Sequence, residues 1–470
     1  MDGLECSEVM LSEIDLGDRM DAEYFSKSSV NIVHRLSHVK TLKIGEVASA
    51  VASAFYPAAT QLYSVGNLPF VRCVDCVNYP VITRDQDSTF EKIPRSFAVE
   101  NKGVSILQRY EILITKVGTP CYASIVDDYD EVALSRTVMG LKNIHGIDPY
   151  YLLVFLRCKY GFGQLYRQRE QTIQYQLTLP RVKDVDVFIP SREFQMTIKD
   201  IVKEYCSGMR KSTRLYASAQ EKLNEELHFD RNDISHENIT TKSLSDTFSA
   251  GRLDAEYFMP KYDFLFSLLS KLPTQRLGEL VSITKSIEPG SECYGQEGIP
   301  FIRVSDISKM GITEPSIRIP ENIIPNLEAL YPREDTILLS KDGSIGIAYK
   351  VREDMRAVTS GALLHLRVKD ASVLPDYLTL VLNSEIVQLQ AERDSNGAII
   401  QHWKPYDIAN VIIPVMPHDI QQEISDSVRE SFRLRKESER MINLAVKSVE
   451  LAIESNEESA INLIKEQMNQ

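Results

Sequence analysis

Cys73 and Cys76 form a lone C-x-x-C pair, a spacing that occurs in many zinc sites. Zinc takes about four protein ligands in such structural sites. The sequence offers no second C-x-x-C and no H-x-x-H to complete one. We therefore expect both cysteines to be strand residues, and we predict no metal site and no cofactor.

Asp148-Pro149-Tyr150-Tyr151 resembles the D-P-P-Y motif of adenine methyltransferases but lacks its second proline. No glycine-rich cofactor strand accompanies it, and the counterpart Leu374-Pro375-Asp376-Tyr377 is typical of a helix start. A phosphate-binding loop, a G-x-S-x-G elbow and a dinucleotide loop are also missing from the sequence. His402, next to Trp403, is the most interesting histidine, but an isolated histidine is more often structural. We expect no catalytic residues.

The composition is that of a globular protein of two or three domains: 470 residues, 43% hydrophobic and 25% charged. No apolar run approaches the roughly 18 to 20 residues that span a bilayer, and the N-terminus does not resemble a secretory signal. Seven scattered cysteines argue against a disulfide framework. We therefore expect a cytoplasmic protein with no membrane partner.

The net charge of −13 counts against a free-standing DNA-binding protein, because contacts to phosphate need lysine and arginine. The total charge says little about any single face, however. A partner subunit could also supply much of the positive surface.

An internal duplication organises the chain. Arg19–Phe25 recurs as Arg252–Phe258, and Ile112–Lys116, followed by Gly118, recurs as Ile337–Lys341, followed by Gly343. Further matches keep the same order: Ile44–Val47 with Leu277–Leu280, Leu68–Arg72 with Ile299–Arg303, Asp75 with Asp306, Pro149 with Pro375, and Phe188–Pro190 with Ile412–Pro414. So many collinear matches indicate two copies of one module.

Short apolar runs bounded by turn residues predict strands at 68–74, 111–116, 123–126 and 185–189. Each copy also contains a predicted helix, at 149–160 and 375–391, that opens with proline. Each copy ends in a longer helix with apolar residues at 3-4 spacing, Ile198 to Leu227 and Ile424 to Ala452. Such helices would be rods on the order of 45 Å long. This pattern favours packing of helix on helix over packing of each helix on its own domain.

The duplicated order resembles the specificity subunit of Type I restriction–modification systems. The shared features are a Gly-Glu-Val/Leu opening, a Pro-Phe-Val/Ile-Arg strand, an Ile-Leu-Ile/Leu-Thr/Ser-Lys-x-Gly-Thr/Ser hairpin, glutamine-containing turns and a terminal Ile-Pro strand. The next helix begins at Gln195 in one copy and at Gln421 in the other. The resemblance covers about residues 15 to 455; each motif is moderately specific, and the full order occurs twice.

The resemblance implies a fold, a function and partners. The fold is α+β, with two pseudo-symmetric mixed α/β target recognition domains, each followed by a long helix, and the two helices form an antiparallel coiled-coil-like spacer. The chain would recognise a bipartite target in double-stranded DNA without catalytic residues of its own. Two methyltransferase subunits would bind the helices and carry the chemistry, and a motor-nuclease restriction subunit could join them.

The predicted organisation follows from the repeat and the resemblance. Its segments are an N-terminal arm (1–40), the first target recognition domain (41–192), a long helix (193–230), a linker with a short helix (231–272), the second target recognition domain (273–416), a second long helix (417–455) and a C-terminal tail (456–470). The tail either extends the helix or binds a partner.

Polar loop residues flanked by strands are the candidates for DNA contact, because bases are read through donors and acceptors at their groove edges. In the first module these are Lys116, Thr119, Arg136, Gln174 and Tyr175. In the second they are Lys341, Ser344, Thr359, Gln401, His402 and Trp403. Any one of these residues could instead cap a turn.

Two pairs of candidates hold corresponding positions. Lys116 and Lys341 each follow a strand and precede a glycine by two residues, which fits a shared, sequence-neutral phosphate contact. Gln174 and Gln401 each follow an isoleucine, and a side-chain amide can pair with adenine. Arg72 with Asp75, and likewise Arg303 with Asp306, fits an internal ion pair as well as a DNA contact.

Two other classes of protein stay open. A duplicated scaffold in a defence complex that does not bind DNA would suit the acidic charge. An enzyme with an unrecognised active site is less favoured, because no paired carboxylates, ligand clusters or phosphate loops stand at equivalent places.

Overall fold

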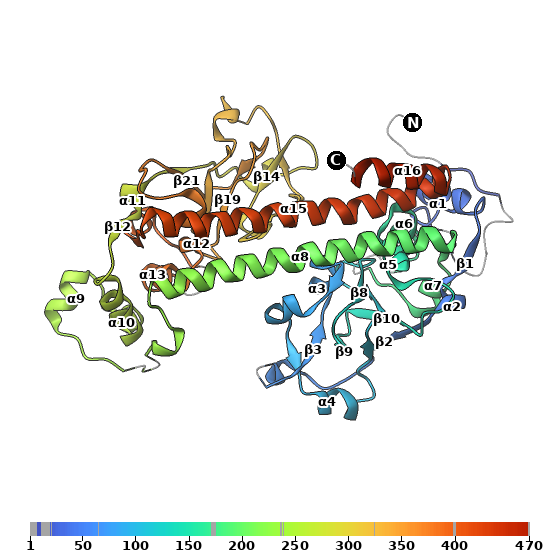
Figure 1. Ribbon diagram of the computed structural model, residues 1–470, viewed down its shortest axis with the longest axis horizontal. Helices are drawn as coiled ribbons and strands as arrows, with labels where there is room; N and C mark the ends of the chain where they lie inside the picture. Colours follow the sequence, from blue (N-terminus) through green and yellow to red (C-terminus); the bar gives the residue numbers. More distant parts are fainter. Residues whose placement is uncertain are drawn as a thin grey trace. The chain divides into compact units, whose positions relative to one another are not determined.

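The chain forms two compact units in a computed structural model, and the two have a similar order of elements (Figure 1). The first unit comprises residues 1–210 and 435–470, and the second comprises residues 211–434. The structure describes residues 7–10, 19, 21–63, 65–170, 175–235, 237, 239–323, 325–397 and 401–468.

The first unit contains two sheets and one short strand pair. A five-stranded sheet has the order β2 (Ser49–Ala52), β10 (Val138–Lys142), β7 (Ile112–Thr115), β8 (Ala123–Val126) and β4 (Val81–Ile82). A four-stranded sheet has the order β5 (Lys92–Ile93), β3 (Leu68–Val71), β9 (Glu131–Leu134) and β6 (Ile106–Gln108). The strand pair joins β1 (Thr41–Lys43) to β11 (Asp186–Phe188).

Several helices of the first unit pack against the five-stranded sheet. Helix α5 (Pro149–Arg157) packs on β8 and on α6 (Lys159–Arg167), and α1 (Lys27–Leu36) packs on α6. Helix α5 begins where it does because Pro149 suits a first turn and the Asp148 carboxylate accepts the N–H of Tyr150 at 3.0 Å. The shorter helices are α2 (Ile44–Val47), α3 (Cys73–Asn78), α4 (Arg95–Glu100) and α7 (Leu179–Lys183).

The second unit repeats this plan with its strands grouped differently, in two smaller sheets and two strand pairs. Its sheets are β13 (Val281–Lys285), β21 (Leu363–Val368), β18 (Ile337–Ser340) and β19 (Ala348–Lys350) in one, and β17 (Arg318–Ile319), β14 (Ile299–Ile302) and β20 (Val358–Thr359) in the other. Strand pairs join β12 (Thr274–Arg276) to β22 (Ile412–Pro414) and β15 (Ile307–Ser308) to β16 (Gly311–Ile312). Its helices are α9 (Leu244–Ala250), α10 (Pro260–Leu269), α11 (Leu277–Leu280), α12 (Pro375–Leu382), α13 (Glu385–Asp394) and α14 (Pro405–Ala409).

Two long helices, α8 (Arg192–Glu226) and α15 (His418–Glu454), are each divided between the units. One half of each helix belongs to the first unit and the other half to the second. In the first unit, Ile198 and Val202 of α8 share a buried core with Ala445 and Val449 of α15. In the second unit, Lys222 pairs with Glu423 at 3.7 Å.

The helices run antiparallel within the second unit. Ser212 lies beside Ser431, with 3.1 Å between the Oγ atoms, whereas the later residue Lys222 lies beside the earlier residue Glu423. This pairing and the repeated order of elements confirm the predicted α+β fold with two modules and paired antiparallel helices.

The prediction that Cys73 and Cys76 are strand residues is wrong. Strand β3 ends at Val71, and helix α3 begins with Cys73. The helix starts there because the Asp75 carboxylate turns back and accepts the N–H of Arg72 at 2.8 Å.

Each inner helix predicted as continuous is divided into two. The backbone of Cys158 is extended between α5 and α6, and that of Ser384 is extended just before α13. The tail forms a separate helix, α16 (Glu457–Met468), which packs in the first unit with Ala460 and Ile464 buried in its core. The tail therefore folds back and does not extend α15.

Across the described ranges, no helix combines the length and the apolarity that a membrane span requires. The same residues contain no group of three or more metal-ligating side chains.

Candidate nucleic-acid interface

Three loops meet at the backbone of Lys116 in the first unit: the loop after β7, the loop between β9 and β10, and the segment between α6 and α7. The N–H of Lys116 donates to the carbonyl of Thr137 at 2.7 Å, and its carbonyl accepts the N–H of Leu177 at 3.0 Å. The half-buried Lys116 side chain therefore starts from a fixed backbone position.

Thr119 lies on the exposed tip of the loop after β7. Its carbonyl accepts a hydrogen bond from Cys73 Sγ at 3.5 Å, so α3 supports the loop from beneath. Gly118 makes the turn possible, because its φ of +91° is one that side chains rarely tolerate. The tip therefore presents a hydroxyl group on an ordered backbone.

Arg136 is exposed in the loop between β9 and β10. Its guanidinium lies 4.8 Å from the ring centroid of Tyr56 and 5.8 Å from that of Phe55. The N–H of Arg136 donates to the Tyr56 hydroxyl at 3.1 Å. Phe55 itself is 82% exposed. An arginine fork stacked beside an exposed aromatic ring is well suited to contact a base.

Tyr175 is held by the repeated Arg19–Phe25 segment. The Tyr175 hydroxyl donates to Glu23 Oε1 at 3.3 Å, and Arg169 donates to the same oxygen at 3.0 Å while stacking 3.8 Å from the Tyr175 ring. Gln174, which was also predicted to contact DNA, lies outside the described residues.

The second unit repeats the three-loop arrangement around Lys341. Its N–H donates to the carbonyl of Ala362 at 2.9 Å, and its carbonyl accepts the N–H of Trp403 at 2.8 Å. Ser344 and Gln401 are exposed on two of these loops, and the Gln401 carbonyl accepts the N–H of Gly343 at 2.9 Å.

Asp342 connects two of the predicted residues of this unit. Its carboxylate pairs with Lys341 and accepts a hydrogen bond from His402 Nδ1 at 2.8 Å. Burial tends to raise the pKa of Asp342, but the hydrogen bonds from Lys341 and His402 outweigh it and lower the pKa below its usual value. The Lys341 charge is thus partly neutralised, unlike that of Lys116, for which the described residues show no ion pair.

Thr359 and Trp403 lie in the interior of the second unit, with exposed fractions of 0% and 1%. The Thr359 hydroxyl lies 2.8 Å from Nε2 of His365, whose pKa is lowered to about 4 by burial. Nε1 of Trp403 is buried without a hydrogen-bond partner in the described part of the chain. Neither side chain reaches the surface in this conformation.

The structure also changes one sequence correspondence. Backbone bridges pair Glu170 with Gln176 in the first unit and Asn396 with His402 in the second, with equal numbers of residues between. Gln401 therefore corresponds to Tyr175. The match of Gln401 with Gln174 is off by one residue, because it relied on the preceding isoleucine alone.

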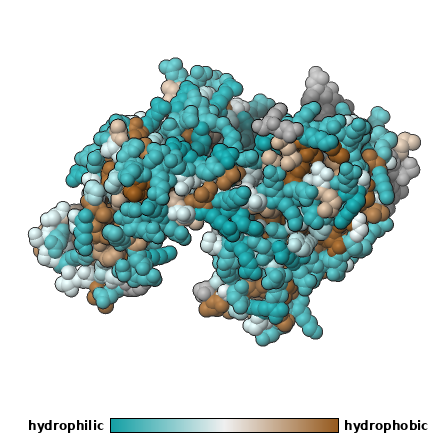
Figure 2. Space-filling view, viewed as in Figure 1, coloured by the Kyte–Doolittle hydropathy of each residue, from teal (hydrophilic) through white to brown (hydrophobic). Residues whose placement is uncertain are grey.

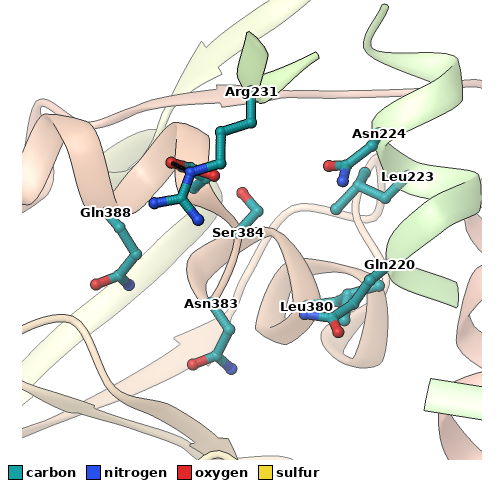
Figure 3. Close-up of a pocket in the computed structure, with 9 residues that line it drawn as sticks. Gln220, Leu223, Asn224, Arg231, Leu380, Asn383, Ser384 and Gln388 are labelled. Atoms are coloured by element: carbon teal, nitrogen blue, oxygen red, sulfur yellow. Dashed lines mark ion pairs between the residues drawn. The ribbon is translucent and has the colours of Figure 1, made fainter. Parts of the chain in front are cut away.

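A cavity of about 420 Å³ lies between α8 and the start of α13 in the second unit (Figure 3). Gln388 in its wall donates to the carbonyl of Gly346 at 2.8 Å, and Asn383 donates to the carbonyl of Ala348 at 2.7 Å. These amides hold the loop after β18 from behind.

The sequence left open whether Arg72 and Arg303 form internal ion pairs or contact DNA. In the structure each forms an ion pair with the aspartate three residues later. Arg72 Nε lies 3.6 Å from Asp75, and Arg303 Nε lies 3.7 Å from Asp306. Both aspartates are largely buried and cap the turn that follows β3 or β14.

Sequence reasoning missed Phe55, Tyr56, Glu23 and Asp342. The repetition of the Arg19–Phe25 motif was a usable signal for Glu23, whereas nothing in the sequence joined Phe55 to Arg136. Hydrophilic residues cover most of the face drawn in Figure 2, in keeping with a surface that meets water or a charged partner.

These features define a duplicated α+β protein in which each module gathers three polar loops and is joined to a long helix. Residues 271–447 match the family described as Type I restriction modification DNA specificity domain. The chain is also 25% identical over 164 residues to the Type I restriction enzyme EcoBI specificity subunit of Escherichia coli. That match covers 35% of this chain and 34% of the relative, so the chain spans about a third of the length of this curated protein.

Two solved structures align over most of the chain. The S subunit of a Type I restriction-modification system from M. genitalium aligns with 13% identity and a TM-score of 0.42, over 87% of this chain and 95% of that chain. The HsdS subunit from Thermoanaerobacter tengcongensis aligns with 17% identity and a TM-score of 0.29, over 89% and 97%.

The match to the Type I restriction modification DNA specificity domain thus covers the second module and most of α15. This confirms the predicted resemblance to specificity subunits of Type I restriction–modification systems.

Proposed function

We propose that this chain is the DNA specificity subunit of a Type I restriction–modification complex. It recognises a bipartite target and positions the methyltransferase subunits, and the restriction subunit where one is present. The observation that carries this proposal is the repeated meeting of three loops at Lys116 and at Lys341, in two modules that share one pair of helices.

Each module is fastened to its helix by charged contacts. In the first unit, Arg210 of α8 pairs with Asp85 at 3.1 Å and with Asp128 at 3.2 Å. In the second unit, the Arg352 guanidinium stacks 4.0 Å from the Phe432 ring of α15 and pairs with Asp376. Contacts of this kind would let the helices set the interval between two recognition surfaces.

The chain is proposed to be non-catalytic and to depend on partners for chemistry. Two methyltransferase subunits on the paired helices would modify the DNA, with the protein in the cytoplasm. The predicted contact residues of the first module remain Lys116, Thr119, Arg136, Gln174 and Tyr175. Those of the second are led by the exposed Ser344, Gln401 and His402, with Lys341 beside them, whereas Thr359 and Trp403 would need a rearrangement to reach DNA.

The alternative is a scaffold that does not contact DNA, and the net charge of −13 favours it. A gel-shift experiment separates the two. The chain is assayed alone and with its cognate methyltransferase on duplexes that carry the motif found by sequencing methylated bases in a host with the gene. We expect sequence-selective binding by the complex. Complexes that bind no DNA, or a host methylation pattern that is unchanged when the gene is deleted, would support the scaffold.

A further inference from the structure

Position 136 of the first unit and position 361 of the second are structurally equivalent. The N–H of Ser135 donates to the carbonyl of Val71, the last residue of β3, at 2.9 Å. In the same way, the N–H of Ser360 donates to the carbonyl of Ile302, the last residue of β14, at 2.8 Å. The next residue is Arg136 in the first unit and Gly361 in the second. Both positions therefore lie at the same point of the three-loop arrangement.

The chemistry at these two positions is opposite. Arg136 places a cation over the Tyr56 ring, and its N–H donates to the Tyr56 hydroxyl at 3.1 Å. Gly361 has no side chain, and its N–H donates to Oε2 of Glu288 at 2.9 Å. A tyrosine hydroxyl and a glutamate carboxylate thus accept the same backbone hydrogen bond in the two modules.

Arg136 is prepared to donate hydrogen bonds to an external partner. No carboxylate among the described residues pairs with it, although acidic residues outnumber Lys and Arg in this chain by 66 to 53. Contact with the Tyr56 ring holds the guanidinium near the loop and leaves donors of its fork available. The exposed ring of Phe55 beside it adds an apolar surface, and covering that surface with a partner is favourable in free energy.

Glu288 presents the complementary group. Its side chain is exposed, and Oε2 is fixed by the Gly361 N–H. Its Oε1 has no hydrogen-bond partner in the part of the chain that the structure describes. A carboxylate oxygen accepts from the amino group of cytosine, whereas an arginine fork pairs with O6 and N7 of guanine.

We propose that Arg136 and Glu288 are specificity-determining residues at equivalent places in the two modules. Arg136 reads a guanine in one half-site, and Glu288 reads a cytosine amino group in the other. The inference rests on the proposed function and adds the base that each module reads at this position.

The test is selection from a randomised double-stranded DNA library by the full chain in complex with its cognate methyltransferase. Arg136→Ala should lower the preference for guanine at one position of one half-site by about 5- to 150-fold, the range for a lost bidentate contact. The other half-site should be unchanged. Arg136→Lys keeps the charge but not the fork, so it should retain most of the affinity and lose most of the discrimination.

Glu288→Gln is the matched change in the second module, because the amide oxygen can still accept the Gly361 N–H. It should relax the cytosine preference of the second half-site alone. Thermal melting of each complex establishes that the variants are folded.

The outcomes are distinguishable. If the Arg136 variants weaken binding equally for all sequences, Arg136 contacts phosphate and the inference is overturned. The inference is also overturned if the base preferences of both half-sites are unchanged in all three variants. If the wild-type complex selects no bipartite sequence at all, the proposed function itself fails.

Discussion

The hydroxyl groups of Ser212 on α8 and Ser431 on α15 lie 3.1 Å apart, buried between the two helices of the second unit. The Ser431 hydroxyl also donates a hydrogen bond to the backbone carbonyl of Ser212 at 2.8 Å. A polar pair inside an apolar helix seam favours one register, because sliding the helices would leave both groups without partners.

The serine pair leads to a stability prediction. Ser431→Ala should lower the free energy of unfolding by about 1 to 3 kcal/mol, because it leaves the buried Ser212 hydroxyl without its partner. The double variant Ser212→Ala/Ser431→Ala should be less destabilised than the sum of the single variants. Denaturant titration followed by the fluorescence of Trp403 measures this, since it is the one tryptophan and lies buried in the same unit. Strict additivity would contradict the coupling.

The paired helices lead to a prediction about spacing. Deleting seven residues from each helix, 211–217 and 427–433, removes nearly two turns and about 10 Å of rise. The unread spacer of the DNA target should shorten by about three base pairs, at about 3.4 Å per base pair, with both half-sites retained. Sequencing of methylated bases in a host that carries the variant measures the length of the spacer. Altered half-sites with an unchanged spacer would refute the role of the helices.

Lys116 leads to a prediction about salt dependence. Lys116→Ala should weaken DNA binding about equally for all sequences and reduce the slope of log affinity against log salt by about 1. Lys40→Ala is the matched control, because Lys40 is exposed in the same unit but outside the three loops. Titrations of the complex at several salt concentrations provide the slopes. A change of preferred sequence in Lys116→Ala would show a base contact instead.

His365 leads to a prediction about pH. Burial lowers its pKa to about 4, so between pH 4 and about 6.5 the unfolded chain binds the proton more readily than the folded chain does. The contribution of His365 to stability should therefore be constant above pH 6.5. It should fall by on the order of 3 kcal/mol as the pH drops to 4.

His365→Gln is the control for this pH effect, since an amide can still bond to the Thr359 hydroxyl but does not titrate. Unfolding followed through Trp403 at a series of pH values compares the two proteins. Their stability curves should run parallel above pH 6.5 and diverge below it. Parallel curves down to pH 4.5 would mean that His365 does not titrate as described.

Patterns that recur in both halves of the sequence predicted the architecture well. The Ile-Leu-Ile/Leu-Thr/Ser-Lys runs became β7 and β18, and the apolar 3-4 spacing became α8 and α15. Such features are local, because the type of each residue reflects its own burial and secondary structure. The division at Cys158 escaped prediction because no proline or glycine marks it, only an extended backbone.

The surface was harder to predict than the framework, because exposure depends on distant residues. Thr359 looked like a loop hydroxyl, yet it ends β20 and turns toward His365. Arg136 was predicted, but Phe55 and Tyr56, which orient it, lie some eighty residues earlier in the chain. Stacking between such remote residues leaves no mark in local sequence pattern.

The first unit takes its core from both ends of the sequence, residues 1–210 and 435–470. Met441, Val449 and Ile464 complete that core, yet they leave the ribosome only after the whole second unit has been synthesised. At about 5 to 20 residues per second, the early segment waits on the order of 10 to 45 s with an apolar face uncovered. During synthesis the second unit can therefore finish folding before the first, and the core shared with α15 and α16 is the last part of the first unit to form.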